Sequence, residues 1–227
     1  MSRLKKYILR WLCSCLIFFI MACSNNQNIN ISKAIAESMQ LERNIIITKN
    51  ELISFKQKIK IGDVITRTGN DFTSQSLKSL NQRDKTFSHC GIANIENDSL
   101  FIYHAIGGEF NPNQQIKRES FEIFVSPYYN NAVGIFRFDI STNQNKKLIK
   151  QAQLFYKSKI IFDLDFDLKT DDKMYCAEFV YKSFLQASGN AIKFHHSFIK
   201  QFEFVGVDDI TLNSFSKKIE VYNYKLY

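Results

Sequence analysis

Two short apolar segments separated by Asn97-Asp98 constrain the fold of this chain more than any other feature. Residues 88–95 and 100–106 are mostly apolar, and each is the length of one strand, so both are predicted to be strands. Asparagine and aspartate tolerate positive φ angles, and the pair between the segments therefore predicts a two-residue hairpin turn. Because the turn sets the register, it also decides which side chains share a face of the sheet.

The predicted register brings two histidines together. With a two-residue turn, Gly91 lies opposite His104, and His89 shares the face of Gly91 because side chains alternate along a strand. His89 and His104 are then diagonal neighbours, roughly 7–8 Å apart at the backbone. A three-residue turn would shift the register by one and put His104 on the other face. Cys90 follows His89, so it is expected to point to the opposite face and is interpreted as a core residue.

An amphipathic segment follows Asp172 and is predicted to be a helix that stops near Gly189. Asp172 is the expected cap of its first turn, because a negative charge suits the positive end of the helix dipole. Glu178, Lys182 and Gln186 lie on one side and are expected to be mostly exposed. The buried face repeats at helical spacing through Cys176, Phe179, Val180, Ser183, Phe184 and Ala187.

Cys176 lies in the first turn of that predicted helix, on the side that meets the sheet. The helix dipole favours thiolate over thiol there, and the thiolate is the nucleophilic form of cysteine. His89 and His104 can supply a base and an orienting group if the fold brings them to the sulfur. The alternative interpretation is that Cys176 only packs in the core, as unpaired cysteines commonly do. The adjacent His195 and His196 are interpreted as surface or local packing residues.

The rest of the pattern predicts a single α+β domain. Strands cluster in the middle of the chain with helices before and after them, which argues against a doubly wound sheet. Residues 160–168 are expected to be extended, and residues 121–125 are ambiguous. The other expected elements are helices over residues 32–58, 71–80 and 143–158, with Ser32 and Ser141 as possible caps, and strands over residues 61–65, 132–138 and 219–226.

The amino-terminal residues are predicted to be a lipoprotein signal. A basic start precedes an apolar stretch over residues 11–21, which is too short for an ordinary transmembrane helix. The stretch ends in Ile20-Met21-Ala22-Cys23, which resembles a lipobox, so Cys23 is the expected lipidation site. The implied location is the bacterial cell envelope, with the membrane as a partner through the lipid; an ordinary signal peptide or a weak anchor helix is the alternative. The expected division is a signal over residues 1–22, a tether and helix over 23–58, and a folded domain over 59–227.

Charge and cysteine content exclude several classes of function. The formal charge of +8 includes four positive charges in the basic start, and no stacking or groove-reading motif indicates nucleic-acid binding. Of five cysteines, Cys13 and Cys15 leave with the signal and Cys23 carries lipid. Cys90 and Cys176 remain, which is not a disulfide framework, and no cluster has zinc-ligand spacing. Neither a metal nor a cofactor is expected.

Four motifs together resemble a known family: Ile61-Gly62-Asp63-Val64-Ile65, Ser88-His89-Cys90-Gly91-Ile92, Tyr103-His104-Ala105 and Tyr175-Cys176-Ala177-Glu178-Phe179. They occur in the order seen in YiiX/YebB-like cysteine hydrolases. These are circularly permuted members of the NlpC-type papain-like superfamily, in which histidine precedes cysteine. The resemblance spans residues 60–187 and implies an α+β fold in which an antiparallel sheet packs against a helix carrying the cysteine.

The resemblance implies a nucleophile at Cys176, a base at His89 and an orienting third residue at His104. Many relatives carry glutamate at the third position, whereas lecithin retinol acyltransferase-like relatives use histidine there. The implied reaction is hydrolysis of an amide or ester through a thioester acyl-enzyme, with a peptide, peptidoglycan or lipid-linked acyl substrate. A phospholipid-dependent acyltransferase and a non-catalytic binding lipoprotein are the alternatives.

Overall fold

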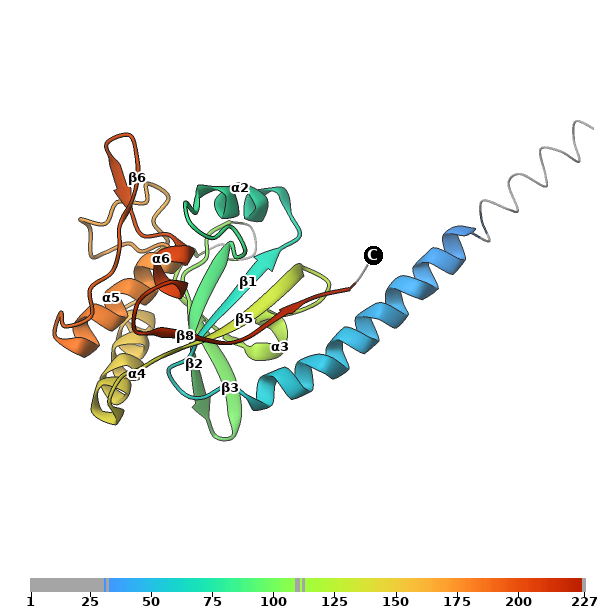
Figure 1. Cartoon of the computed structure of the whole chain (residues 1–227), viewed down its shortest axis with the longest axis horizontal. Helices are drawn as coiled ribbons and strands as arrows, with labels where there is room; N and C mark the ends of the chain where they lie inside the picture. Colours follow the sequence, from blue (N-terminus) through green and yellow to red (C-terminus); the bar gives the residue numbers. More distant parts are fainter. Residues whose placement is uncertain (1–30, 32, 109–110, 112, 226–227) are drawn as a thin grey trace, which may run out of the picture. The chain divides into compact units, whose positions relative to one another are not determined.

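The computed structural model describes residues 31, 33–108, 111 and 113–225, which fall into two compact units that divide at residue 46. The second unit, residues 47–226, holds the sheets and the helices labelled in Figure 1. The predicted signal over residues 1–22, the lipidation site Cys23 and the possible cap Ser32 lie outside the described residues. Within the described part of the chain, no helix is both long enough and apolar enough to cross a membrane.

A six-stranded antiparallel sheet is the centre of the second unit, in the order β4-β3-β2-β1-β5-β8. Figure 1 labels five of these strands, β1, β2, β3, β5 and β8. Its strands are β1 (Val64–Gly69), β2 (His89–Glu96), β3 (Ser99–His104), β4 (Lys117–Ser120), β5 (Asn130–Phe138) and β8 (Ser216–Asn223). A separate hairpin consists of β6 (Ser197–Ile199) and β7 (Phe202–Phe204). The antiparallel order confirms the predicted α+β class, because a doubly wound fold requires parallel strands.

The helices agree closely with the sequence pattern where that pattern is long. Residues 33–57 are helical, and the labelled helices are α2 (Phe72–Leu80), α3 (Phe121–Phe124), α4 (Thr142–Lys157), α5 (Cys176–Ser188) and α6 (Val207–Thr211). The ambiguous segment 121–125 is the short helix α3. Sequence reasoning missed β4, β6, β7 and α6, because elements of three to five residues are too short to show a period.

Polar side chains and a glycine define the helix ends. The Asp71 side chain accepts a hydrogen bond from the Ser74 backbone N–H (2.9 Å) at the start of α2. Ser141 forms a capping box with Gln144 at the start of α4, as its position predicted. Gly189 follows α5 with a φ of 62°, a left-handed conformation that glycine adopts without strain.

The Asn97-Asp98 turn sets the register of β2 and β3 as predicted. Both residues have positive φ, 48° and 61°, as a two-residue hairpin turn of type I′ requires. Glu96 pairs with Ser99, which places His104 beside Gly91. A Cβ atom on Gly91 would lie 2.9 Å from the Cβ atom of His104, so a glycine is needed at this close approach.

Two strands differ in their limits from the sequence prediction. β1 begins at Val64 rather than Ile61, because Gly62 has a φ of 87° and Asp63 accepts a hydrogen bond from the Lys60 backbone N–H (2.7 Å), which makes a turn. β8 covers residues 216–223 rather than 219–226, because its pairing with β5 sets its limits.

Two hydrophobic cores cover the opposite faces of the sheet. On one face α4 and α5 lie side by side, and Cys90 and Ile92 of β2 belong to the same buried cluster as Phe179 of α5 (Figure 1). On the other face, Ala93 of β2 packs in a cluster with Phe124 of α3. Successive residues of β2 thus belong to different cores, as the two-residue period of a strand requires.

Candidate active site

His89 and His104 form a direct pair between the first residue of β2 and the last residue of β3. The Nε2 atom of His89 lies 2.9 Å from the Nδ1 atom of His104, and the rings are nearly perpendicular with centroids 5.0 Å apart. Both rings pack against Phe124 of α3, at centroid distances of 5.7 and 5.0 Å. The pairing predicted from the hairpin register is therefore confirmed.

Glu119 of β4 extends this pair by one strand, and sequence reasoning missed it. Its Oε2 atom lies 3.2 Å from His104 Nε2. The angle between the two groups is not that of a hydrogen bond, so the interaction is mainly electrostatic. Lys117 Nζ lies 2.7 Å from the other oxygen, Oε1. Burial alone would raise the pKa of Glu119, but His104 and Lys117 hold that pKa well below its ordinary value. Glu119 is therefore a carboxylate at neutral pH.

These contacts select one arrangement of protons. A carboxylate can only accept, so we assign the proton of His104 to Nε2, which faces Glu119, and its Nδ1 becomes an acceptor. His89 then donates from Nε2 to His104, which leaves the Nδ1 lone pair of His89 free. A neutral histidine with a free lone pair is a base.

Burial keeps both histidines neutral at pH 7. It is the largest effect on each ring, and it lowers the pKa of His89 and of His104 from 6.5 to about 4. Cys176 opposes this shift at His89, and Glu119 opposes it at His104.

Cys176 is the first residue of α5, but the helix cap differs from the prediction. Tyr175 is the N-cap, whereas Asp172 is exposed and lies three residues before it, separated by extended chain. The Tyr175 backbone N–H donates to Glu178 Oε2 (3.2 Å), and the Tyr175 hydroxyl accepts from the Val205 backbone N–H (2.8 Å). The start of α5, which Asp172 was expected to stabilise, is therefore stabilised by the buried Glu178 and by the loop that contains Val205.

The Cys176 sulfur reaches His89 and Cys90 at the same time. The sulfur interacts with the His89 side chain and with the thiol and backbone of Cys90, and these interactions lower the pKa of Cys176. α5 packs on the Cys90 face of the sheet and not on the histidine face. Cys90 is buried in the core as predicted, but it also contacts the site. The sulfur reaches His89 because His89 is the first residue of β2, where the sheet ends.

These contacts give the two thiols opposite acidities. The hydrogen bond from Cys90 is the largest effect on Cys176; burial opposes it, His89 adds to it, and the pKa of Cys176 falls well below its ordinary 9.0. Burial raises the pKa of Cys90 well above that value. Cys176 is thus the acidic thiol, and Cys90 is the thiol that donates to it.

A family model matches most of this chain, including the two histidines and Cys176. The model described as permuted papain-like amidase enzyme, YaeF/YiiX, C92 family, matches residues 58–215. This chain belongs to the C92 family. The structure of this chain is similar to the crystal structure of the metalloprotein YiiX from Escherichia coli O157:H7, with a TM-score of 0.57 and 16% sequence identity. The match covers 71% of this chain and 96% of the YiiX chain, so the two proteins share a fold. No curated protein sequence matches this chain.

One side of α5 in this C92-family chain is more buried than its sequence predicted. Glu178 is 0% exposed and Lys182 is 8% exposed, whereas Gln186 is exposed as expected. Lys182 Nζ lies 3.0 Å from Glu178 Oε1 and 2.7 Å from Asp171 Oδ1, so the loop before the helix covers this side. Burial raises the pKa of Glu178 to about 7, although Lys182 opposes the shift.

The segment 160–168 folds over the start of α5 as a loop. Asp163 is buried and accepts hydrogen bonds from the backbone N–H groups of two later loop residues, at 2.9 and 2.6 Å. Phe166 packs on the Tyr175 ring with centroids 4.9 Å apart, and a Cβ atom on Gly107 would meet Phe162. The loop thus packs, through Phe166, on the residue that precedes Cys176.

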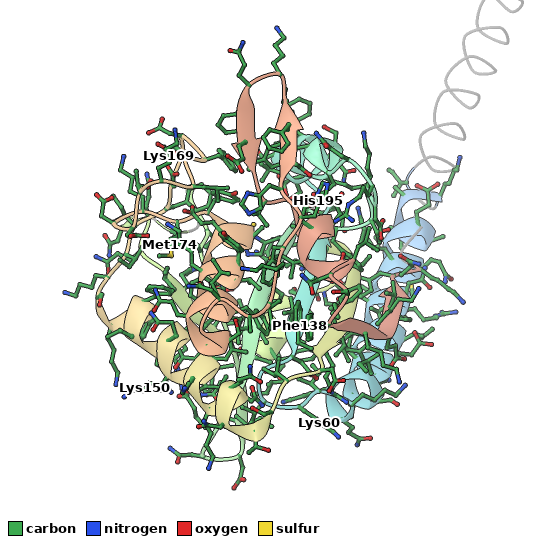
Figure 2. All side chains as sticks on the ribbon, turned by 60° about the vertical axis from the view of Figure 1, so that its left-hand side comes forward. Lys60, Phe138, Lys150, Lys169, Met174 and His195 are labelled. Carbon is green, nitrogen blue, oxygen red and sulfur yellow. The ribbon has the colours of Figure 1, made fainter. Side chains whose placement is uncertain are left out.

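His195 and His196 take no part in this constellation. His195 Nδ1 lies 2.7 Å from Asp209 Oδ1 of α6, beside which Figure 2 labels it, and His196 Nδ1 lies 2.6 Å from Glu203 Oε1. These separate contacts agree with their interpretation as local packing residues. Across the described residues, no group of three or more histidine, cysteine or acidic side chains is placed to hold a metal ion.

Proposed function

We propose that Cys176, His89 and His104 hydrolyse an amide or ester through a thioester acyl-enzyme. The observation that carries this proposal is the buried pair of His89 and His104, with Glu119 3.2 Å behind His104 and with Cys176 as the acidic thiol that interacts with His89. Membership in a family of permuted papain-like amidases supports a cysteine hydrolase. Glu119 joins the proposal as the group that orients His104.

In the active form, Cys176 and His89 share one proton. When that proton moves to His89 Nδ1, the thiolate attacks the carbonyl carbon, and the resulting imidazolium is stabilised through His104 by the charge of Glu119. The carbon–nitrogen or carbon–oxygen bond then breaks, and the leaving group takes the proton from His89. Water attacks the thioester, gives a proton to His89, and releases the acid and the free thiol.

The start of α5 offers a donor for the developing oxyanion. In the described residues, the first N–H of the helix that bonds to a backbone carbonyl is that of Phe179, which donates to Tyr175. The Cys176 N–H belongs to the first turn and has no intrahelical partner. We therefore assign it to the carbonyl oxygen of the substrate, next to the attacking sulfur.

A substrate panel with the full chain tests this function. Labelled peptides, peptidoglycan fragments, N-acyl lipids and phospholipids are incubated with the wild type and with Cys176→Ala, and His195→Ala serves as a histidine control. We expect release of labelled acid and a transient acyl adduct on Cys176 in the wild type and in the control, but not in Cys176→Ala. Label on a second lipid or amine would indicate the acyltransferase alternative, and no adduct with any substrate would indicate a binding protein.

We also propose that Cys23 is lipid-modified and anchors the enzyme in the bacterial cell envelope. The motive is the basic start, the short apolar stretch and Ile20-Met21-Ala22-Cys23 in the sequence. Mass spectrometry of the native amino terminus should find a diacylated cysteine as its first residue. An unmodified terminal residue other than Cys23 would contradict the proposal.

A further inference from the structure

We propose that Arg67 of β1 binds a carboxylate of the substrate next to the reacting carbonyl, so that the substrates are acyl compounds with a carboxylate near the scissile bond. This inference deepens the hydrolase function proposed above and rests on it. It names a substrate class and a residue that selects it.

Arg67 lies on the face of the sheet that carries the histidines. It pairs directly with His89 across β1 and β2, and side chains of directly paired residues lie next to each other. Its guanidinium carbon is 4.5 Å from the centroid of the Phe124 ring, the same ring that contacts His89 and His104. Arg67 is therefore an immediate neighbour of the proposed base.

Arg67 differs from other arginines of this unit in having no carboxylate partner. Its Nη1 atom donates to the Phe124 carbonyl oxygen (2.8 Å), and among the described residues neither Nε nor Nη2 has a hydrogen bond and no carboxylate lies within ion-pair distance. The guanidinium groups of three other arginines each lie within 2.9 Å of a carboxylate, namely Arg83, Arg118 and Arg137.

The free edge of Arg67 matches the shape and charge of a carboxylate. Anchoring Nη1 leaves the Nε–H and Nη2–H groups, which form a planar fork that binds two carboxylate oxygens. Burial lowers the pKa of Arg67, while the charges of Glu119 and Cys176 oppose that shift, and an arginine stays protonated at neutral pH. Burying a cation without a partner lowers the stability of the folded protein, and the Arg67 side chain is half-buried. One bound carboxylate would balance its single positive charge.

Alkylation of Cys176 tests this proposal without any turnover. The thiolate displaces iodide from iodoacetate, which carries a carboxylate, or from iodoacetamide, its neutral counterpart. In the wild type at pH 7 we expect the rate to saturate with iodoacetate and to rise linearly with iodoacetamide. In Arg67→Gln both should be linear, and the iodoacetate-to-iodoacetamide rate ratio should fall about tenfold, as expected for losing one charged hydrogen-bonded contact.

Two further variants make the outcome specific. Arg67→Lys keeps the charge but not the fork, so it should lose saturation, and it reports on the site even if Arg67→Gln folds poorly. Arg118→Gln removes an arginine that pairs with Glu96 (2.6 Å), and it should leave both rates unchanged. An unchanged rate ratio in Arg67→Gln, or linear iodoacetate kinetics in the wild type, would overturn the proposal.

Competing anions define the ligand chemistry. Acetate should slow alkylation by iodoacetamide in the wild type and not in Arg67→Gln. Protection by methyl phosphate at lower concentrations than acetate would refute the carboxylate and indicate a phosphate instead. Because alkylation needs no catalysis, failure of the substrate panel would refute the hydrolase function while Arg67-dependent saturation still demonstrated the anion site.

Discussion

At the scale of single residues, the acidity of Cys176 comes from groups that a helix-start argument does not supply. The thiol and backbone of Cys90 and the ring of His89 surround the sulfur and together outweigh the effect of burial on its pKa. The same burial keeps Cys90 protonated, so it can donate. The two cysteines of one site thus have different roles, because Cys90 and His89 lower the pKa of Cys176 whereas burial raises the pKa of Cys90.

The first residue-scale prediction concerns Cys90. Cys90→Ala removes the donor to Cys176, so the pKa of Cys176 should rise and alkylation by iodoacetamide at pH 6 should slow, while the rate at pH 9 changes little. Rates measured from pH 4 to 10 report this shift. Cys90→Ser keeps a donor and should restore part of the effect. Preferential labelling of Cys90 in the wild type at pH 6 would contradict the assignment of Cys176 as the nucleophile.

The second residue-scale prediction ranks the groups behind the sulfur. His89→Ala removes the base and should lower kcat by about 10²–10⁴-fold. Glu119→Gln should lower kcat by less, because the amide still occupies the space but no longer stabilises the charged histidine pair. Glu122→Gln is the matched control, since Glu122 contacts Lys56 (2.6 Å) away from the site and should keep full activity. Equal losses in Glu119→Gln and Glu122→Gln would exclude a role for Glu119.

At the scale of elements, a hairpin and a helix start deliver the reacting groups. The Asn97-Asp98 turn and the missing side chain of Gly91 bring the histidine strands together. The start of α5 is held by Glu178, which bonds the Tyr175 N–H and pairs with Lys182. The site therefore depends on a buried ion pair that touches no reacting atom.

The element-scale prediction concerns this ion pair. Glu178→Ala leaves the buried Lys182 ammonium without its buried carboxylate partner and the Tyr175 N–H without an acceptor. The free energy of unfolding should fall by about 3–5 kcal/mol, as expected for breaking a buried pair. Urea denaturation measures the change. Gln186→Ala, on the exposed side of the same helix, should stay within about 0.5 kcal/mol, and Glu178→Gln should recover part of the loss.

At the scale of the whole molecule, the site lies where two cores meet at the end of the sheet. The core under α4 and α5 supplies the two cysteines, and the core under α3 surrounds the two histidine rings. Neither layer contains a complete site. Because both histidine rings are buried between these layers, protonating them should lower the free energy of unfolding.

The whole-molecule prediction is a loss of stability in mild acid. His89 and His104 bind protons near pH 6.5 when unfolded but near pH 4 when folded, so the unfolded state binds more protons between these values. The free energy of unfolding should thus fall by a few kcal/mol as the pH drops from about 6.5 to about 4, at about 1.4 kcal/mol per unit of pKa difference.

Urea denaturation at several pH values measures this dependence. His104→Gln should reduce the slope because it removes one of the two buried rings. Gln186→Ala, which removes an exposed amide that does not titrate, should leave the slope unchanged. A wild-type free energy of unfolding that stays constant from pH 6.5 to 4 would contradict the burial argument.

Features that depend on neighbours along the chain could be predicted from the sequence alone. The turn at Asn97-Asp98, the paired histidines, the capped helix α4 and the buried face of α5 all follow from local conformational preference and from periods of two or 3.6 residues. The order of the four motifs along the chain indicated the family, and the family model that matches residues 58–215 confirms it.

Contacts between groups that are distant in the sequence could be seen only in the tertiary structure. Glu119 lies on a four-residue polar strand without an apolar pattern, so only its pairing with β3 brings it to His104. The face on which α5 packs, the contact of Cys90 with Cys176, and the burial of Glu178 beneath a loop likewise result from packing between separate segments. Periodicity shows that a face is buried but not what covers it, because the covering atoms come from elsewhere in the chain.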